Sequence, residues 1–448
     1  MRPFEPSPTR DATLFRPIEQ TSRGFYLAVA LLGAVVLFAV IMYVRQVMLG
    51  LEVTGMMQPV TWGFYIVNFV FFIGISHAGT LISAILRLTR AEWRRPITRM
   101  AEVITAIVLA IGALHPILDL GRPDRIANVI RYGRLQSPLL WDVTSISAYF
   151  AASTVYLYLP LIPDIALLRD RARKHRWLYE FLSWGWQGTP QQWKVLARAL
   201  NIMMIAVIPV AVSVHTVISY IFAMTLQSGW HSTIFGPYFV VGAILSGIAA
   251  LFVAMIVFRK AFHLEAYLKP IHFEQLGKLF LAIAVIWGYF TFCEYLTGYY
   301  GGEPEEMTTL LYKLVGSYAP FFWTMVACNF VIPVAILSFR RLRTVRGILV
   351  TSIAVLAGMW LERLIIIVPT LENPHMPFPV RIYVPTLTEI SLFAGALALF
   401  ALGFLLFAKF FPVVSVWEVQ EGRVLAVAEM KERIESYLPE EEPNDARA

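Results

Sequence analysis

The chain of 448 residues is 58% hydrophobic and 15% charged, and its mean hydropathy is +0.64. This composition does not suit a surface that faces water, so it excludes a soluble multidomain protein. Two cysteines, Cys293 and Cys328, lie in apolar runs and exclude a disulfide framework, a cysteine-rich metal site and a CxxCH attachment site for c-type haem. In so apolar a chain, the net charge of +7 indicates loops that orient the protein in a membrane rather than nucleic-acid binding.

Residues 1–24 are polar and rich in proline, and they lack the apolar region and cleavage site of a signal peptide. They are predicted to be a cytoplasmic tail. After them, ten stretches have the roughly 20 apolar residues that cross a bilayer. In order, the predicted spans are Phe25–Leu49, Thr61–Leu88, Arg99–Leu118, Ser137–Ile162, Leu200–Leu226, Tyr238–Phe258, Phe273–Tyr295, Ala319–Phe339, Val345–Thr370 and Thr386–Phe411.

The predicted fold is an all-α integral membrane protein with about ten transmembrane helices in residues 25–411. The runs are far longer than barrel strands, and lipid offers the backbone no hydrogen bonds, so helices are required. Within this region, residues 164–198 carry a charged run followed by tryptophans, which is typical of an interfacial helix. Residues 412–448 are predicted to be a second cytoplasmic tail.

Lys and Arg are concentrated in the N-terminal tail and in every second connection between spans. The positive-inside rule therefore places both termini in the cytoplasm. The connection after the third span is exceptional, because residues 119–136 carry four arginines on the outer side. We expect these arginines to do more than orient the chain.

Ionisable residues gather near the predicted outer face. His115 and Asp119 are spaced i and i+4 on one helical face, Arg122 and Asp124 follow in a turn, and Asp142 begins the fourth span. Such residues in a membrane are candidates for function because their insertion is costly. A quinol hydroxyl that is hydrogen-bonded to His or Asp can lose its proton as the electron leaves. The alternative is a structural corner of salt bridges.

A second group of polar residues lies deeper in the predicted spans. A ladder of titratable and hydroxyl groups of this kind can relay protons across the bilayer. Two alternatives remain: structural hydrogen bonding, or a b-type haem with His77 and His215 as its axial pair. The predicted proton path comprises His77, Glu102, Asn68, Ser76, Thr80 and His215.

The later spans carry Glu294, Glu362, Arg363 and Glu389. Glu294 is a candidate to support the quinone site. Glu362 and Arg363 are adjacent in sequence and do not face each other on a helix, so each is expected to pair elsewhere. The sequence contains neither a Walker loop nor an HExxH motif, and no metal site is expected.

Several motifs resemble the NrfD-like family of quinone-interacting membrane subunits, which includes the polysulfide reductase anchor. They are Trp62-Gly-Phe-Tyr through Ser76-His-Ala-Gly-Thr, His115-Pro, Leu120-Gly-Arg-Pro, Ser213-Val-His-Thr and Gly229-Trp-His-Ser-Thr-Ile-Phe-Gly-Pro-Tyr. Ten spans resemble, within the family, the large membrane subunits of alternative complex III.

The resemblance implies a subunit of a quinol oxidoreductase complex without its own haem or iron–sulfur centre. It implies two four-helix bundles, in residues 61–226 and 238–370, and a site for menaquinol or ubiquinol near the periplasmic face. The family's outer His and Asp match His115 and Asp142, the expected catalytic pair. The implied partners are periplasmic iron–sulfur and haem c subunits and a paralogous ten-helix subunit, in a bacterial inner membrane. The hypothesis that the complex translocates protons rests instead on the predicted proton path.

Three other classes compete with this interpretation. A secondary transporter requires matched halves with broken helices, and the sequence shows no convincing inverted repeat. A cytochrome b-like subunit requires haem ligation by His77 and His215. A structural anchor requires only that His115 and Asp142 brace the corner while a neighbouring subunit binds quinone.

Overall fold

The computed structural model describes residues 11–77, 79, 82–171, 175–374, 378 and 382–437, with the side chains of 431–437 excepted. Within these residues it is helical and has no strand. In this part of the chain, nine helical stretches are long and apolar enough to cross a membrane, and α3 is a shorter apolar helix. The prediction of an all-α integral membrane protein is therefore confirmed.

The spanning elements follow the predicted order. They are α2 (Arg23–Leu49), α3 (Phe64–His77) with α4 (Ser83–Leu88), α5 (Arg95–Asp119), α7 (Pro138–Arg171), α9 (Pro190–Ala223), α10 (Phe235–Ala261), α11 (Pro270–Gly301), α13 (Ala319–Val326) with α14 (Ile332–Leu337), α15 (Val345–Glu372) and α16 (Leu387–Phe410). A π-helical turn, Ala327–Val331, joins α13 to α14.

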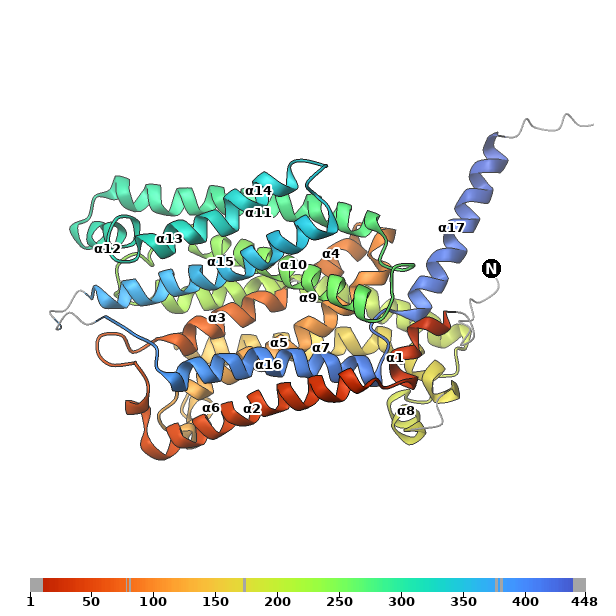
Figure 1. Cartoon of the computed structure of the whole chain (residues 1–448), viewed down its shortest axis with the longest axis horizontal. Coiled ribbons are helices and arrows are strands. Elements are labelled where there is room, and N and C mark those ends of the chain that lie inside the picture. The colour runs from red at the N-terminus through yellow and green to blue at the C-terminus, as the bar shows by residue number, and fades with distance from the viewer. Residues whose placement is uncertain are drawn as a thin grey trace, which may run out of the picture.

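The remaining α-helices lie at the two ends of the bundle. They are α1 (Arg16–Glu19), α6 (Asn128–Arg131), α8 (Arg176–Leu182), α12 (Pro304–Leu314) and α17 (Val416–Tyr437). Figure 1 shows α1, α8 and α17 at one end, which we call the Glu418 end, and α6 and α12 at the other, which we call the His115 end. The described parts of the first and last segments thus meet at the same end.

Residues 164–198 do not form one separate element. The first eight of them continue α7 and the last nine belong to α9, so that α8 is the only helix contained within the described part of the segment. The end of α7 stays in the bundle because the fully buried Asp164 carboxylate pairs with the Arg99 guanidinium at 2.6 Å. An ion pair so deeply buried requires its charges to remain together.

Local sequence explains where several helices begin. Thr189 and Gln192 form a capping box ahead of α9, with Pro190 in the first turn. Thr386 and Glu389 form another ahead of α16. Inside α5, Pro116 cannot donate a backbone hydrogen bond to the preceding turn, which loosens the ladder at the turn that carries His115.

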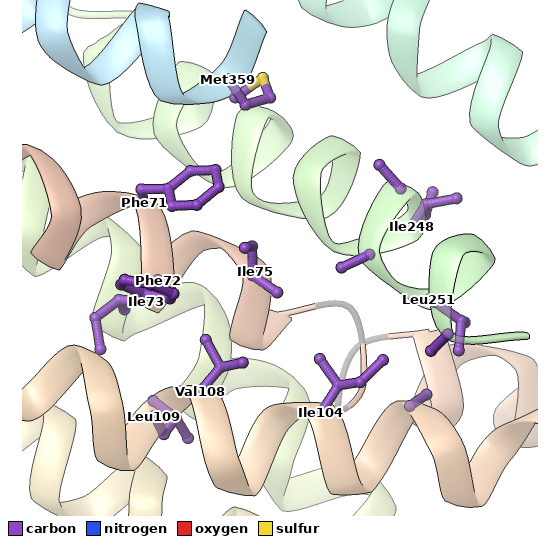
Figure 2. Close-up of a cluster of buried hydrophobic side chains, with 14 of the residues drawn as sticks. Phe71, Phe72, Ile73, Ile75, Ile104, Val108, Leu109, Ile248, Leu251 and Met359 are labelled. Carbon is purple, nitrogen blue, oxygen red and sulfur yellow. The ribbon is translucent and has the colours of Figure 1, made fainter. Parts of the chain in front are cut away.

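The helices run up and down along the long axis of the molecule (Figure 1). In the first half, α3 packs on α5, α5 on α7 and α7 on α9; in the second, α10 packs on α11 and α15. α3 also contacts α10 and α15, and α2 pairs with α16 beside α5. Figure 2 shows the apolar side chains that join α3 to α5, among them Phe72 and Val108.

Buried charges fasten α17 to the bundle at the Glu418 end. The Glu418 carboxylate is 2% exposed and lies 2.7 Å from Arg87 and 2.9 Å from Arg94. Burial opposes its ionisation, but the surrounding guanidinium groups outweigh this effect and lower the pKa of Glu418 to about 2. Arg95 also donates to the Glu418 backbone carbonyl at 3.0 Å.

Glu418→Gln should destabilise the protein by about 3–5 kcal/mol, because two buried guanidinium groups lose their counter-charge. The control is Glu421→Gln, whose carboxylate is 38% exposed in its pair with Arg95; it should cost less than about 1 kcal/mol. Unfolding in detergent measures both. If Glu418→Gln lowers the free energy of unfolding no more than Glu421→Gln does, the buried Glu418 carboxylate does not hold α17 in place.

The ion pairs of Glu418 also predict how the stability of the protein depends on pH. The folded pKa of Glu418 is about 2 against an ordinary 4.5, so its stabilisation is fully present above pH 4.5 and is lost as the pH falls through 2. The stability difference between the unsubstituted chain and Glu418→Gln should therefore narrow between these values in a pH series of melting curves. A difference that does not change with pH would contradict this origin.

Candidate functional site

His115 presents a buried hydrogen-bond acceptor near the end of α5. Its side chain is 1% exposed, and its Nδ1 lies 2.9 Å from the carbonyl oxygen of Ile111. A carbonyl only accepts, so this bond places the proton on Nδ1 and leaves Nε2 as an acceptor in the neutral ring. No partner for Nε2 is found among the described residues. The ring of Phe72 packs against His115 with 5.2 Å between centroids.

Two carboxylates add acceptors at the same end of the bundle. Asp142, 8% exposed, is the fifth residue of α7, and Asp119 is the last residue of α5. One oxygen of each is buried without a partner in the described part of the chain. Because α5 packs on α7 and unsatisfied buried acceptors are costly, this end is suited to a ligand that brings hydroxyl donors.

A network that sequence reasoning missed holds α5 at this end. Gln46 of α2, 2% exposed, donates from Nε2 to the carbonyl oxygen of Leu118 at 2.7 Å. Its Oε1 accepts from the Tyr65 hydroxyl of α3 at 2.5 Å. The only signal in the sequence was a glutamine within an apolar span.

Arg122 and Asp124 lie apart from the buried acceptors. They pair with each other at 3.0 and 2.9 Å in the turn after α5, and their side chains are 64% and 59% exposed. The hydrogen bond from Arg122 lowers the pKa of Asp124 below its ordinary value. The structure thus places the pair at the surface near the site.

His77 and His215 meet in the middle of the bundle, where α3 faces α9. Their ring centroids are 3.9 Å apart. His77 Nε2 lies 2.6 Å from the carbonyl oxygen of Ala211, and its Nδ1 lies 3.1 Å from that of Ile73. A haem iron must lie between its two axial ligands, and rings in contact leave no room for the macrocycle. The geometry therefore argues against the haem alternative.

The remaining proton-path residues fall into separate groups. The Ser76 hydroxyl, 3.4 Å from His77 Nδ1, belongs with the histidines. Glu102 accepts from the Ser83 hydroxyl at 2.9 Å, and Ser83 lies 3.2 Å from the Tyr156 hydroxyl. Asn68 instead accepts from the Trp360 indole at 2.8 Å. Thr80 lies outside the described residues.

Glu294 lines a different cavity, of about 190 Å³, at the His115 end of the second half. This cavity also contains Lys313, whose ammonium group donates to the Thr370 hydroxyl at 2.9 Å. One oxygen of Glu294 is buried without a hydrogen-bond partner in the described ranges. Glu294 therefore lines a cavity separate from the surroundings of His115.

Glu362 and Arg363 were each predicted to pair with other residues. This prediction was wrong, because their charged groups pair with each other. The Arg363 guanidinium lies 3.1 Å from the Glu362 carboxylate, and each side chain is 1% exposed. Long side chains allow adjacent residues to meet although their Cβ atoms diverge. Glu362 also accepts from the Trp287 indole at 2.7 Å, and Arg363 lies over the Phe239 ring at 4.8 Å.

Residues 52–373 match the family described as Polysulphide reductase, NrfD. The chain belongs to this family. The match covers α3 to α15 and includes every residue of the candidate site except Gln46. Among the described residues, no group of three His, Cys, Asp or Glu side chains is arranged to hold a metal ion.

Curated relatives belong to oxidoreductases. The chain is 26% identical to a membrane subunit of the putative dimethyl sulfoxide reductase of Halobacterium salinarum, over 76% of each chain. It is 24% identical to the Hdr-like menaquinol oxidoreductase integral membrane subunit of Archaeoglobus fulgidus, over 92% of this chain and 99% of the relative. It is also 24% identical to a subunit of the selenate reductase of Mesobacillus selenatarsenatis, over 73% of this chain and 78% of the relative. The chain is thus similar to membrane subunits of oxidoreductases that contain several subunits.

A double-mutant cycle should reveal the coupling of the Glu362–Arg363 pair. Glu362→Gln or Arg363→Met alone should each cost about 3–5 kcal/mol, since each leaves a buried charge unpaired. The double variant should cost clearly less than the sum of the two. Unfolding in detergent gives the four values, and strictly additive losses would show that the charges do not interact.

Proposed function

We propose that this chain is a quinol-oxidising membrane subunit of an electron-transfer complex in a bacterial cytoplasmic membrane. The observation that carries the proposal is the set of unpartnered buried acceptors on His115, Asp142 and Asp119 within the described residues. The menaquinol oxidoreductase subunit among its relatives, which aligns along nearly its whole length, supports menaquinol as the substrate in preference to ubiquinol.

The proposed reaction removes two electrons and two protons from a quinol. One quinol hydroxyl donates to His115 Nε2, and the other donates to the Asp142 carboxylate. As each O–H bond breaks, its proton moves to that acceptor, and the electrons leave to the redox centres of partner subunits. Asp119 then accepts protons on the way out, and the Arg122–Asp124 pair orients the ring or gates this exit.

The proposed partners follow from the lack of a redox motif in the sequence and from the kind of complex to which the relatives belong. They are periplasmic iron–sulfur and haem c subunits, which accept the electrons, and a paralogous ten-helix membrane subunit, as in alternative complex III. With both termini in the cytoplasm, the His115 end faces these subunits. Each of the relatives is named as a subunit, which supports the presence of other subunits but not their specific kind.

We further propose that His77, His215, Ser76 and Glu102 carry protons across the membrane. Both nitrogens of His77 face carbonyl oxygens, so a second proton on the ring enters a waiting hydrogen bond. Asn68 supports this path from the Trp360 side.

Asp142→Asn and His115→Leu should each slow quinol oxidation by about 100-fold or more, because each removes a proton acceptor. Thr144→Val, an exposed position on α7 two residues after Asp142, is the control and should stay within about twofold. Steady-state oxidation by the purified complex measures all three. Unchanged rates for both buried variants would reject the site and favour a structural anchor beside a quinone-binding neighbour.

Glu102→Gln should lower the number of protons translocated per electron while quinol oxidation continues, because Glu102 lies away from the proposed ring site. The complex in proteoliposomes with a pH-sensitive dye provides the measurement. Thr144→Val, an exposed position on α7, is the control. Normal translocation by Glu102→Gln would remove Glu102 from the path.

A further inference from the structure

A large apolar cleft lies between the first half of the bundle, the second half, and the α2–α16 pair. Its volume is about 800 Å³, and every residue that lines it is apolar. Its walls come from α2, α3, α5, α10, α15 and α16, and they include Leu32, Phe72, Val108, Ala254 and Phe404. A polar ligand would lose its hydrogen bonds here, so the cleft suits a hydrocarbon chain.

One wall residue of the cleft packs directly against His115. Phe72, in this wall, packs on the His115 ring with 5.2 Å between centroids. Val108, also in the wall, precedes His115 by seven residues and so lies on the same face of α5. In Figure 2, Phe72 and Val108 lie together between α3 and α5. Phe72 therefore contacts both the cleft and the His115 ring that carries the buried acceptor.

The size of the cleft fits a long chain. About 800 Å³ is roughly five times the 150 Å³ or so that accommodates a benzene molecule in a protein interior. The cleft also extends from mid-bundle at Phe72 to Phe262 and Leu405, in the half of α10 and α16 nearer the Glu418 end. An elongated apolar chain of several branched units matches this form.

We propose that the cleft binds the isoprenoid tail of the quinol whose ring is oxidised at His115. This inference rests on the proposed function and extends it to substrate recognition. The tail enters from lipid beside α2 and α16, follows the face of α5 that carries Val108, and ends at Phe72, which turns the ring toward His115 Nε2. Because lipid is as apolar as the cleft, tail binding gains affinity through close van der Waals contact with the walls rather than through the hydrophobic effect.

The test compares menaquinol-4, which carries four isoprene units, with menadiol, which has no tail. The variant is Ala28→Phe with Ala401→Phe, which fills the cleft from two walls. The matched control is Ala30→Phe, on the same helix as Ala28 but exposed and outside the cleft. The purified complex is assayed with each quinol and ferricyanide as electron acceptor, and size-exclusion chromatography checks assembly.

Filling the cleft should raise the KM for menaquinol-4 about tenfold, because the tail loses its packing contacts with two walls, while the KM for menadiol stays within about twofold. Ala30→Phe should leave both KM values unchanged. Should the double variant fail to assemble, Ala28→Phe alone provides the same comparison, because Ala28 is only half-buried.

Two results would overturn the inference. One is a KM for menaquinol-4 that does not change when the cleft is filled. If mass spectrometry then also finds phospholipid bound to the unsubstituted complex and lost from the variant, the cleft holds a phospholipid chain instead of the quinol tail. The other is an equal change for the two quinols. His115→Leu separates this failure from failure of the proposed function, because loss of the site at His115 abolishes oxidation of both quinols. Normal oxidation of both by His115→Leu would reject the function and, with it, the tail site.

Discussion

Hydrocarbon offers no hydrogen bonds, and this constraint governs where each polar group of the chain lies. Within the described residues, most buried polar side chains satisfy it with partners from distant parts of the sequence. Asp164 pairs with Arg99 and accepts the backbone N–H groups that begin α17. Glu418 pairs with Arg87 and Arg94. His115 Nε2 and one oxygen of Asp142 are among the buried polar atoms that have no partner within the described residues, and we propose that these two serve a ligand.

Different residues hold the end of α5 in place and provide the unpartnered acceptors. Gln46 fixes the end of α5 to α2 and α3 through two hydrogen bonds, and Pro116 loosens the backbone ladder beside His115. The His115 ring is held by Ile111 on one side and Phe72 on the other. A fixed ring with one free acceptor is the preorganisation that proton transfer requires.

Much of the fold could be predicted from the sequence, because span length and hydropathy are local properties. The same reasoning identified His115 and Asp142 as candidates, since ionisable residues in apolar runs are conspicuous. It could not find the contacts of Gln46 with Tyr65 and Leu118, which depend on how three helices pack. It also misjudged the Glu362–Arg363 pair, because the Cβ directions of neighbours do not fix where long side chains end.

The residues of the proposed proton path fall into separate groups, and this too depends on how the helices pack. Spacing along the helices placed His77, Asn68 and Glu102 in one ladder, but only the packed structure shows that Asn68 faces Trp360 while Glu102 faces Ser83. The contact between His77 and His215 likewise depends on the approach of α3 to α9. It is this contact that separates a proton relay from haem ligation.

Photolabelling with an azido-menaquinone tests the central claim most directly. The complex is irradiated with the probe, and the labelled peptides are identified by mass spectrometry, with excess menaquinol as competitor. The account predicts competed label on the end of α5 that carries His115 and on the start of α7 that carries Asp142. Competed label confined to the Glu294 cavity or to another subunit would contradict it.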